Sequence, residues 1–146
     1  MNIFQHREIT GAIIIDTFGR FLLQQRDDID GIIHPGKVGL FGGHREGDET
    51  HLECIVREVH EELSYQIPAE RFEHLAGWEG PDLDVDGGSV RADFFVTRDV
   101  PAEALVITEG TLLTIEIHDV ISIEHKLAPS ARFAIAAFNQ RERGST

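Results

Sequence analysis

The stretch from residue 42 to residue 65, GGHREGDETHLECIVREVHEELSY, has the clearest pattern in the sequence. Thr50 is followed three residues later by Glu53, which is the pattern of a capping box and predicts a helix beginning just after Thr50. Apolar side chains recur at helical spacing through this helix and form one face, at Leu52, Ile55, Val56, Val59 and Leu63. We expect this face to anchor the helix on the core.

Three glutamates share the side of the helix next to that apolar face. With about 100° per residue, Glu58 and Glu62 lie about 40° apart and Glu61 a step further round. Like charges at this spacing repel by about 0.2–0.5 kcal/mol per pair in an exposed helix, and by more where water is excluded. A solvated acidic face is the simplest interpretation. The adjacent Arg57 and the preceding glycine pair instead favour a bound cation such as Mg²⁺, which carboxylates and substrate phosphate can share.

The spacing of these residues resembles the signature of the Nudix, or MutT-like, hydrolase family. That signature is Gly, five residues, Glu, seven residues, Arg-Glu, an apolar residue, any residue, Glu-Glu, any residue, Gly and an apolar residue. Ser64 and Tyr65 replace its closing glycine and apolar residue, and Phe41 stands where proline is usual. The positions that match, within a box spanning 43–65, are Gly43, Glu49, Arg57, Glu58, Val59, Glu61 and Glu62.

The resemblance implies an α/β Nudix fold and hydrolysis of the diphosphate linkage of a nucleoside diphosphate joined to another group X, with Mg²⁺ or Mn²⁺ as cofactor. Glu58 and Glu62 would be direct metal ligands, with Glu61 and a carbonyl at Gly43 as further ones. Arg57 would hold the cluster together through Glu49, or would be an ordinary surface ion pair. The implied catalytic set is Glu49, Arg57, Glu58, Glu61, Glu62 and, on a late loop, Glu109.

Three residues outside the box each have two interpretations. Glu109 is a catalytic carboxylate or a plain turn residue. Arg26, at the end of a predicted strand, binds substrate phosphate or is solvated. Trp78 stacks on a nucleobase or, as is more usual for a lone aromatic in a strand, belongs to the core.

Apolar and β-branched runs predict strands through most of the chain. Because helices are predicted only in the middle and at the end, a mixed sheet sandwiched between helices is favoured. Pro129 marks the start of a closing helix through 130–143. We expect one domain over residues 1–146, with 144–146 as a loose tail. The predicted strands are 8–16, 19–27, 38–41 leading into a glycine turn, 71–80, 89–98 and broken strand material at 105–117.

A formal net charge of −13, from 26 acidic against 13 basic residues, opposes binding to long nucleic acids. No membrane span or signal peptide is predicted, and Cys54 is the only cysteine, so we expect a cytoplasmic protein that binds a small nucleotide-derived diphosphate. Acidic neighbours should raise the pKa of the Cys54 thiol and make it a poor nucleophile. Dimers are common in the family, so the resemblance leaves a homodimer open.

Two alternatives remain. A Nudix domain could sense a nucleotide or nucleotide sugar without turnover, although such a binder has no need of the repelling carboxylates. The run from Asp82 to Asp93 nearly matches a calcium-binding EF-hand loop, but its flanking residues predict a strand, a loop and a second strand. The substrate itself stays open among oxidised nucleoside triphosphates, nucleotide sugars, dinucleoside polyphosphates and ADP-ribose.

Overall fold

The computed structural model describes residues 5–32 and 34–144. Among these residues, seven strands form one mixed sheet in which the order β3-β2-β1-β6-β5 is extended by β4 on β1 and β7 on β2. The strands are β1 (His6–Asp16), β2 (Phe21–Gln25), β3 (Val38–Gly39), β4 (Phe41–His44), β5 (Glu73–Pro81), β6 (Ser89–Val100) and β7 (Thr111–Ile115).

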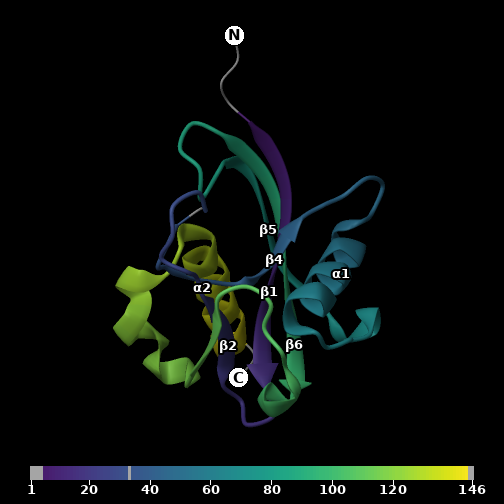
Figure 1. The fold of residues 1–146 in the computed structure, drawn as a ribbon, viewed down its shortest axis with the longest axis vertical. Helices are drawn as coiled ribbons and strands as arrows, with labels where there is room; N and C mark the ends of the chain where they lie inside the picture. Colours follow the sequence, from purple (N-terminus) through teal and green to yellow (C-terminus); the bar gives the residue numbers. More distant parts are fainter. Residues whose placement is uncertain (1–4, 33, 145–146) are drawn as a thin grey trace.

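Helices cover both faces of this sheet (Figure 1). On one face lies α1 (His51–Leu63), and on the other lie α2 (Pro129–Arg143) and the 3₁₀ segment η3 (Ile117–Lys126). Two shorter 3₁₀ turns, η1 (Ala69–Arg71) and η2 (Ala102–Ala104), follow α1 and β6. The predicted arrangement of a mixed sheet between helices is confirmed.

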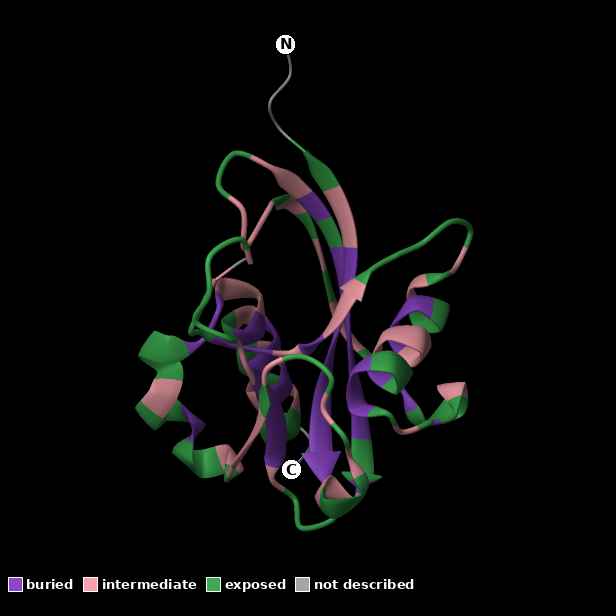
Figure 2. Cartoon of the chain, viewed as in Figure 1, coloured by how far each residue is buried: buried purple, intermediate pink, exposed green. Residues whose placement is uncertain are grey.

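The central strand β1 shows why the sheet needs both layers. It pairs in parallel with β6 and antiparallel with β2 and β4. Because side chains alternate along a strand, Ile13 and Ile15 join the core under α2, whereas Ala12 and Ile14 join the core under α1. Figure 2 shows the strand buried between the two helical layers, as expected for a strand that is apolar on both faces.

The capping box predicted for α1 is present. The Thr50 hydroxyl accepts the Glu53 N–H at 3.0 Å, and the Glu53 carboxylate accepts the Thr50 N–H at 2.8 Å. The helix ends at Ser64, which takes the left-handed conformation (φ 54°) usually filled by glycine. Ile55, Val59 and Leu63 are fully buried as predicted, but Leu52 is 36% exposed.

The predicted glycine turn is wrong, since Gly42 and Gly43 lie within strand β4 and pair with Gly11 and Thr10 of β1. The strands pass so closely that a Cβ at Gly42, where φ is +152°, would lie 2.2 Å from the Thr10 carbonyl oxygen. A side chain is therefore excluded at this crossing.

The broken strand predicted at 105–117 is right in its second part, which forms β7 (Thr111–Ile115), but wrong at 105–108, where no strand forms. The amides of Val106 and Thr108 donate to the carbonyls of Leu63 and Glu62 at 3.0 Å each. These are carbonyls at the C-terminus of α1 that lack partners within the helix. The segment thus closes the helix end, and regular strand pairing begins only at β7.

The closing helix α2 begins at Pro129 as predicted. Phe138 packs edge-on against Phe21 of β2, with ring centroids 5.5 Å apart. No helix within the described residues is both long enough and apolar enough to cross a membrane.

Candidate active site

Arg57 contacts three of the carboxylates of the predicted Nudix box. Its guanidinium grips Glu49 with two nitrogens, at 2.9 Å (Nε) and 2.6 Å (Nη2). Its Nη1 contacts Glu58 at 2.9 Å and Glu61 at 3.4 Å, and its Nη2 donates to the His44 carbonyl at 3.0 Å. The helix is thereby tied to the loop before it and to strand β4.

The Arg57–Glu49 pair is permanently ionised at neutral pH. Hydrogen bonding to Arg57 lowers the pKa of Glu49 to about 2, against the opposing effect of burial. The same pair raises the pKa of Arg57. Both Glu49 oxygens are engaged, one of them also by the Glu46 N–H at 2.9 Å, which suits a positioning carboxylate better than a proton acceptor.

Glu62 is the most buried of the helix carboxylates, with 8% exposure. It accepts the Gly42 N–H at 2.8 Å. Burial raises its pKa to about 8, and the negative charges of Glu58 and Glu109 add to the rise, while the Gly42 N–H and Arg26 oppose it. A cation bound here would take the place of the proton and relieve the repulsion.

Glu58 lies against the backbone of Gly43. A Cβ at residue 43 would be 2.5 Å from the Glu58 carboxyl carbon, so glycine is needed for the carboxylate to pack at this position. Burial raises the pKa of Glu58, although Arg57 opposes the shift. Burial also raises the pKa of the Cys54 thiol to about 11, which agrees with the prediction that it is a poor nucleophile.

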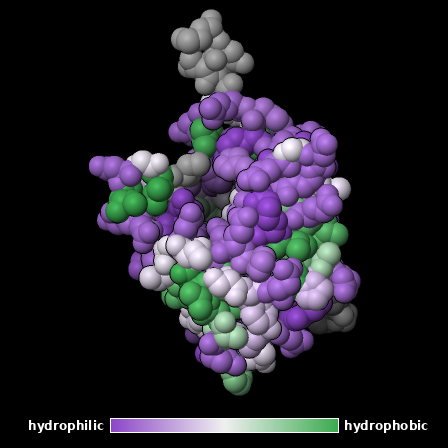
Figure 3. All heavy atoms as spheres, turned by 45° about the vertical axis from the view of Figure 1, so that its right-hand side comes forward, coloured by the Kyte–Doolittle hydropathy of each residue, from purple (hydrophilic) through white to green (hydrophobic). Residues whose placement is uncertain are grey.

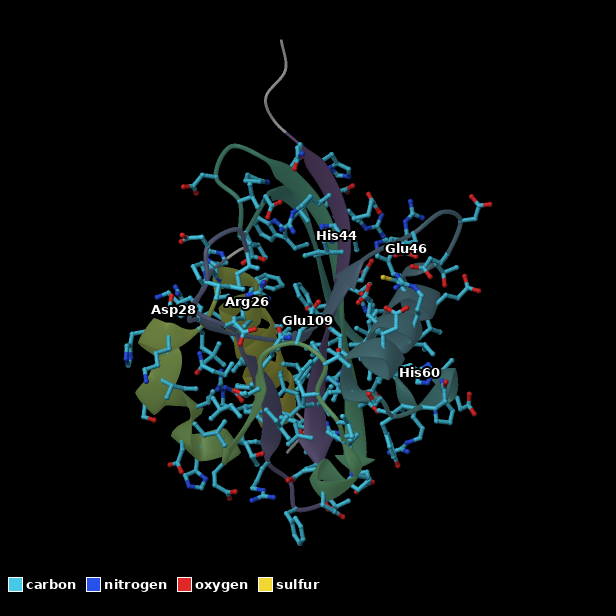
Figure 4. All side chains as sticks on the ribbon, in the orientation of Figure 1. Arg26, Asp28, His44, Glu46, His60 and Glu109 are labelled. Atoms are coloured by element: carbon cyan, nitrogen blue, oxygen red, sulfur yellow. The ribbon has the colours of Figure 1, made fainter. Side chains whose placement is uncertain are left out.

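A cavity of about 290 Å³ opens beside Glu62. Figure 3 shows a hollow in this face of the molecule bordered mainly by hydrophilic residues. Arg26, Gly42, Glu62 and Glu109 all line the cavity, although they come from four separate segments. In Figure 4, Arg26 and Glu109 lie between α2 and α1, whereas His60 lies on the outer side of α1.

The loop that carries Glu109 is held against β2. Gly110 has φ +66°, and a Cβ there would lie 2.3 Å from the Gln25 carbonyl oxygen. The Gln24 amide donates to the Glu109 carbonyl at 3.1 Å. A tight glycine crossing and a side-chain hydrogen bond therefore place this carboxylate at the cavity.

Of the predicted site residues, Arg26, Glu62 and Glu109 line the cavity, whereas Gly43, Glu49, Arg57, Glu58, Glu61 and Trp78 lie outside its lining. The Glu61 side chain is 58% exposed. Trp78 packs edge-on against Phe133, with ring centroids 5.7 Å apart, and its indole N–H donates to the Pro81 carbonyl at 2.8 Å. Within the described residues, no three His, Cys, Asp or Glu side chains are already arranged around one ion, since Glu58 turns to Arg57 and Glu62 to Gly42. The donors are nevertheless the hard oxygens that Mg²⁺ prefers.

The family model described as the NUDIX domain matches residues 5–138. The chain belongs to the Nudix family. No curated protein is similar enough in sequence to match it. The predicted class, a MutT-like Nudix hydrolase, is confirmed.

Solved structures share this Nudix fold at low sequence identity. The MutT protein from Methanosarcina mazei Go1 has a TM-score of 0.78 and 22% identity, over 97% of this chain and 99% of that one. The NUDIX domain of Shewanella oneidensis NrtR, complexed with ADP ribose, has a TM-score of 0.74 and 18% identity, over 97% and 90%.

A third similar structure is much longer than this Nudix chain. It is a bifunctional NMN adenylyltransferase/ADP ribose pyrophosphatase from Francisella tularensis, complexed with AMP and a Mn ion. Its TM-score is 0.71 at 19% identity, and the match covers 97% of this chain but 43% of that one. At these identities the three likenesses establish the fold.

Residues at the far end of the Nudix cavity were not predicted from the sequence. Arg7 of β1 grips Asp82 at 2.6 Å (Nε) and 2.8 Å (Nη2), and Arg7, His34 and Asp84 line the cavity. The only sequence signal was the run of aspartates that resembles a calcium loop. Asp82, Asp84 and Asp86 lie in a hairpin loop between β5 and β6, as the flanking residues predicted, whereas Asp93 lies within β6. Asp82 accepts the Asp84 and Val85 N–H groups instead of binding an ion.

Proposed function

We propose that this Nudix hydrolase cleaves the diphosphate linkage of a nucleoside diphosphate joined to another group X, using Mg²⁺ or Mn²⁺. The observation that carries the proposal is the buried carboxylate of Glu62, which lines one end of a cavity together with Glu109 and whose pKa is raised to about 8 by burial and, further, by the charge of nearby Glu58. The nearest helix cation, Arg57, is already committed to Glu49. The excess negative charge calls for a cation, and the cation in turn would attract a phosphate group.

The residues that would hold the metal are Glu58 and Glu62, with the exposed Glu61 and the carbonyl of Gly43 as further oxygen donors. A bound divalent ion would polarise phosphate oxygens and lower the pKa of a bound water. Arg57 keeps Glu58 oriented, and Arg26 is placed to neutralise phosphate charge. Glu109, also at the cavity, is our candidate for orienting or deprotonating the attacking water.

Similar structures support a small nucleotide as substrate, since one holds ADP ribose and another holds AMP and a Mn ion. We propose the same class here and place the whole of residues 1–146 in one domain. Trp78 stays a weaker candidate for substrate binding, because its indole is packed on Phe133.

The test is metal-dependent turnover by matched variants. Wild type, Glu62→Gln, Glu58→Gln and Glu70→Gln are incubated with a panel of nucleoside triphosphates, nucleotide sugars, dinucleoside polyphosphates and ADP-ribose, with Mg²⁺, with Mn²⁺ and with chelator. Glu70→Gln is the control because Glu70 is exposed in η1, away from the cavity. Mass spectrometry of the products identifies the phosphorus that is attacked.

We expect Glu62→Gln to lower kcat/KM by about 1,000-fold, because a lost metal contact removes several kcal/mol of stabilisation. Gln can still accept the Gly42 N–H, so the variant should fold. Glu70→Gln should match wild type. Wild-type rates for folded Glu62→Gln would refute the metal assignment, and binding without any product across the panel would favour the sensing alternative.

A further inference from the structure

The end of the cavity away from the proposed metal carboxylates contains a second, largely buried acid, Asp84. Its side chain is 10% exposed. One oxygen, Oδ1, accepts the Ser130 N–H at 3.1 Å. The other, Oδ2, lies 3.8 Å from Arg7 Nη2, beyond hydrogen-bond distance. Asp84 therefore faces the cavity with one acceptor oxygen to spare.

His34 adds a ring nitrogen beside the Asp84 carboxylate. Its Nε2 lies 3.5 Å from Asp84 Oδ1 and is buried without a hydrogen-bond partner among residues 5–32 and 34–144. A buried polar atom without a partner costs free energy, and a ligand that pairs with it recovers that cost. The nearby carboxylate favours the tautomer with hydrogen on Nε2.

The charge at this end argues against a second phosphate site. Arg7 is the cation there, and Asp82 engages it with both oxygens. Asp84 would repel an anion. The cavity wall between the two ends includes the apolar side chains of Ile9, Leu40 and Phe94. A flat, neutral group with polar atoms at its edge suits this environment.

We infer that Asp84 and His34 recognise the nucleobase of the substrate and select one with an exocyclic amine next to an unprotonated ring nitrogen, as in cytosine and adenine. The inference rests on the proposed function. The amine donates to Asp84 Oδ2, and the ring nitrogen accepts from His34 Nε2–H. Uracil and hypoxanthine present a carbonyl oxygen to the carboxylate and an N–H to the imidazole N–H, so both contacts become repulsive.

The experiment compares ligands that differ only in this edge. Binding of CMP against UMP, and of AMP against IMP, is measured by calorimetry for wild type, Asp84→Asn and Asp86→Asn. Hydrolysis of CTP against UTP, and of ATP against ITP, is measured in parallel. Asp86→Asn is the matched control, because Asp86 is exposed in the same loop and does not line the cavity.

We expect wild type to prefer the amine-bearing member of at least one pair by about tenfold or more, as for other paired base contacts. Asn at residue 84 can still accept the Ser130 N–H but offers an NH₂ group in place of Oδ2, so the preference should vanish or reverse. Asp86→Asn should keep the wild-type preference. Equal affinity within both pairs, or an unchanged preference in Asp84→Asn, would overturn the inference.

Calorimetry with monophosphates separates this inference from the proposed reaction. If no triphosphate is hydrolysed but CMP or AMP is still preferred, the base recognition holds and the proposed chemistry fails. If turnover occurs without base preference, the chemistry holds and the base recognition fails. Should Asp84→Asn not fold, His34→Asn serves instead, since Asn tolerates the positive φ of 52° at this residue and is too short to replace the ring nitrogen. It should lose the preference.

Discussion

Each end of the cavity has a nearby arginine that contacts a carboxylate with two nitrogens, but the two ends carry different charge. Outside the lining near the α1 end, Arg57 contacts Glu49 with two nitrogens, and at the other end Arg7, which lines the cavity, contacts Asp82 in the same way. Each arginine only partly neutralises the negative charge of the other carboxylates nearby. At the α1 end several such carboxylates lie together, including Glu62 with its raised pKa. Beside Arg7, the single such carboxylate that lines the cavity is Asp84.

This difference indicates what each end binds. The pKa values of Glu58 and Glu62 are raised, since burial disfavours carboxylates whose nearest cation is already shared. The pKa of Asp82 is lowered instead, because hydrogen bonds from Arg7 and from backbone N–H groups outweigh its burial. The α1 end therefore suits a metal ion with phosphate, and the Arg7 end suits a neutral hydrogen-bonding group.

Among changes that keep every carboxylate of the site, the largest effect should come from Gly43→Ala at the α1 end. The new Cβ would occupy the place of the Glu58 carboxylate and displace it by about 1 Å, which can lower kcat about 100-fold. Steady-state kinetics with Mg²⁺ and thermal unfolding are the measurements. Gly144→Ala is the control, since a Cβ there makes ordinary contacts at the end of α2. Unchanged kcat in Gly43→Ala would mean that the Glu58 position does not matter.

Arg57→Lys should have the next largest effect. Lysine cannot grip Glu49 with two nitrogens while also reaching Glu58, so the carboxylates lose their fixed orientation. We expect kcat/KM to fall about 10- to 100-fold, as for other residues that orient metal ligands. Arg98 forms an exposed ion pair with Glu142, so Arg98→Lys should leave kcat/KM unchanged. A rate equal to wild type would show that the charge of residue 57 suffices without its geometry.

The metal-free protein should lose stability as pH rises. Unfolding lowers the pKa of Glu62 from about 8 to its ordinary 4.5, so between these values the folded state holds a proton that the unfolded chain releases. The free energy of unfolding should fall by roughly 2 kcal/mol from about pH 5.5 to about pH 7.5. Denaturant melts with chelator measure it.

Glu62→Gln provides the control for this pH dependence, because it has no proton to release. The free energy of unfolding of the variant should decline less over the same pH range. Mg²⁺ should raise the stability of the wild-type protein but not that of the variant. Parallel pH profiles for the two proteins would contradict the raised pKa of Glu62.

Arg7→Lys should have the smallest effect, and on binding alone. The loss of its two-nitrogen contact with Asp82 loosens the loop that carries Asp84, so KM should rise about threefold to tenfold while kcat stays near wild type. Kinetics of Arg7→Lys beside Arg57→Lys give the direct comparison. A fall in kcat equal to that of Arg57→Lys would erase the distinction between the two ends.

The residues alone were enough to predict α1 and the grouping of its carboxylates. Helical spacing is local, so the capping box at Thr50 and the buried side chains of Ile55, Val59 and Leu63 follow from residues a few positions apart. The contact of Arg57 with Glu49 was implied by the family resemblance, and the structure contains it.

Contacts between distant segments could not be predicted in this way. Gly42 and Gly43 look like a turn until β1 is seen beside them, and 105–108 look like a strand until the amides of Val106 and Thr108 are seen to cap α1. Strand pairing and loop docking depend on partners far along the chain, whose register no local pattern specifies. For the same reason, only the tertiary structure brought Glu109 beside Glu62, and placed Asp84, His34 and Arg7 together at the other end of the cavity.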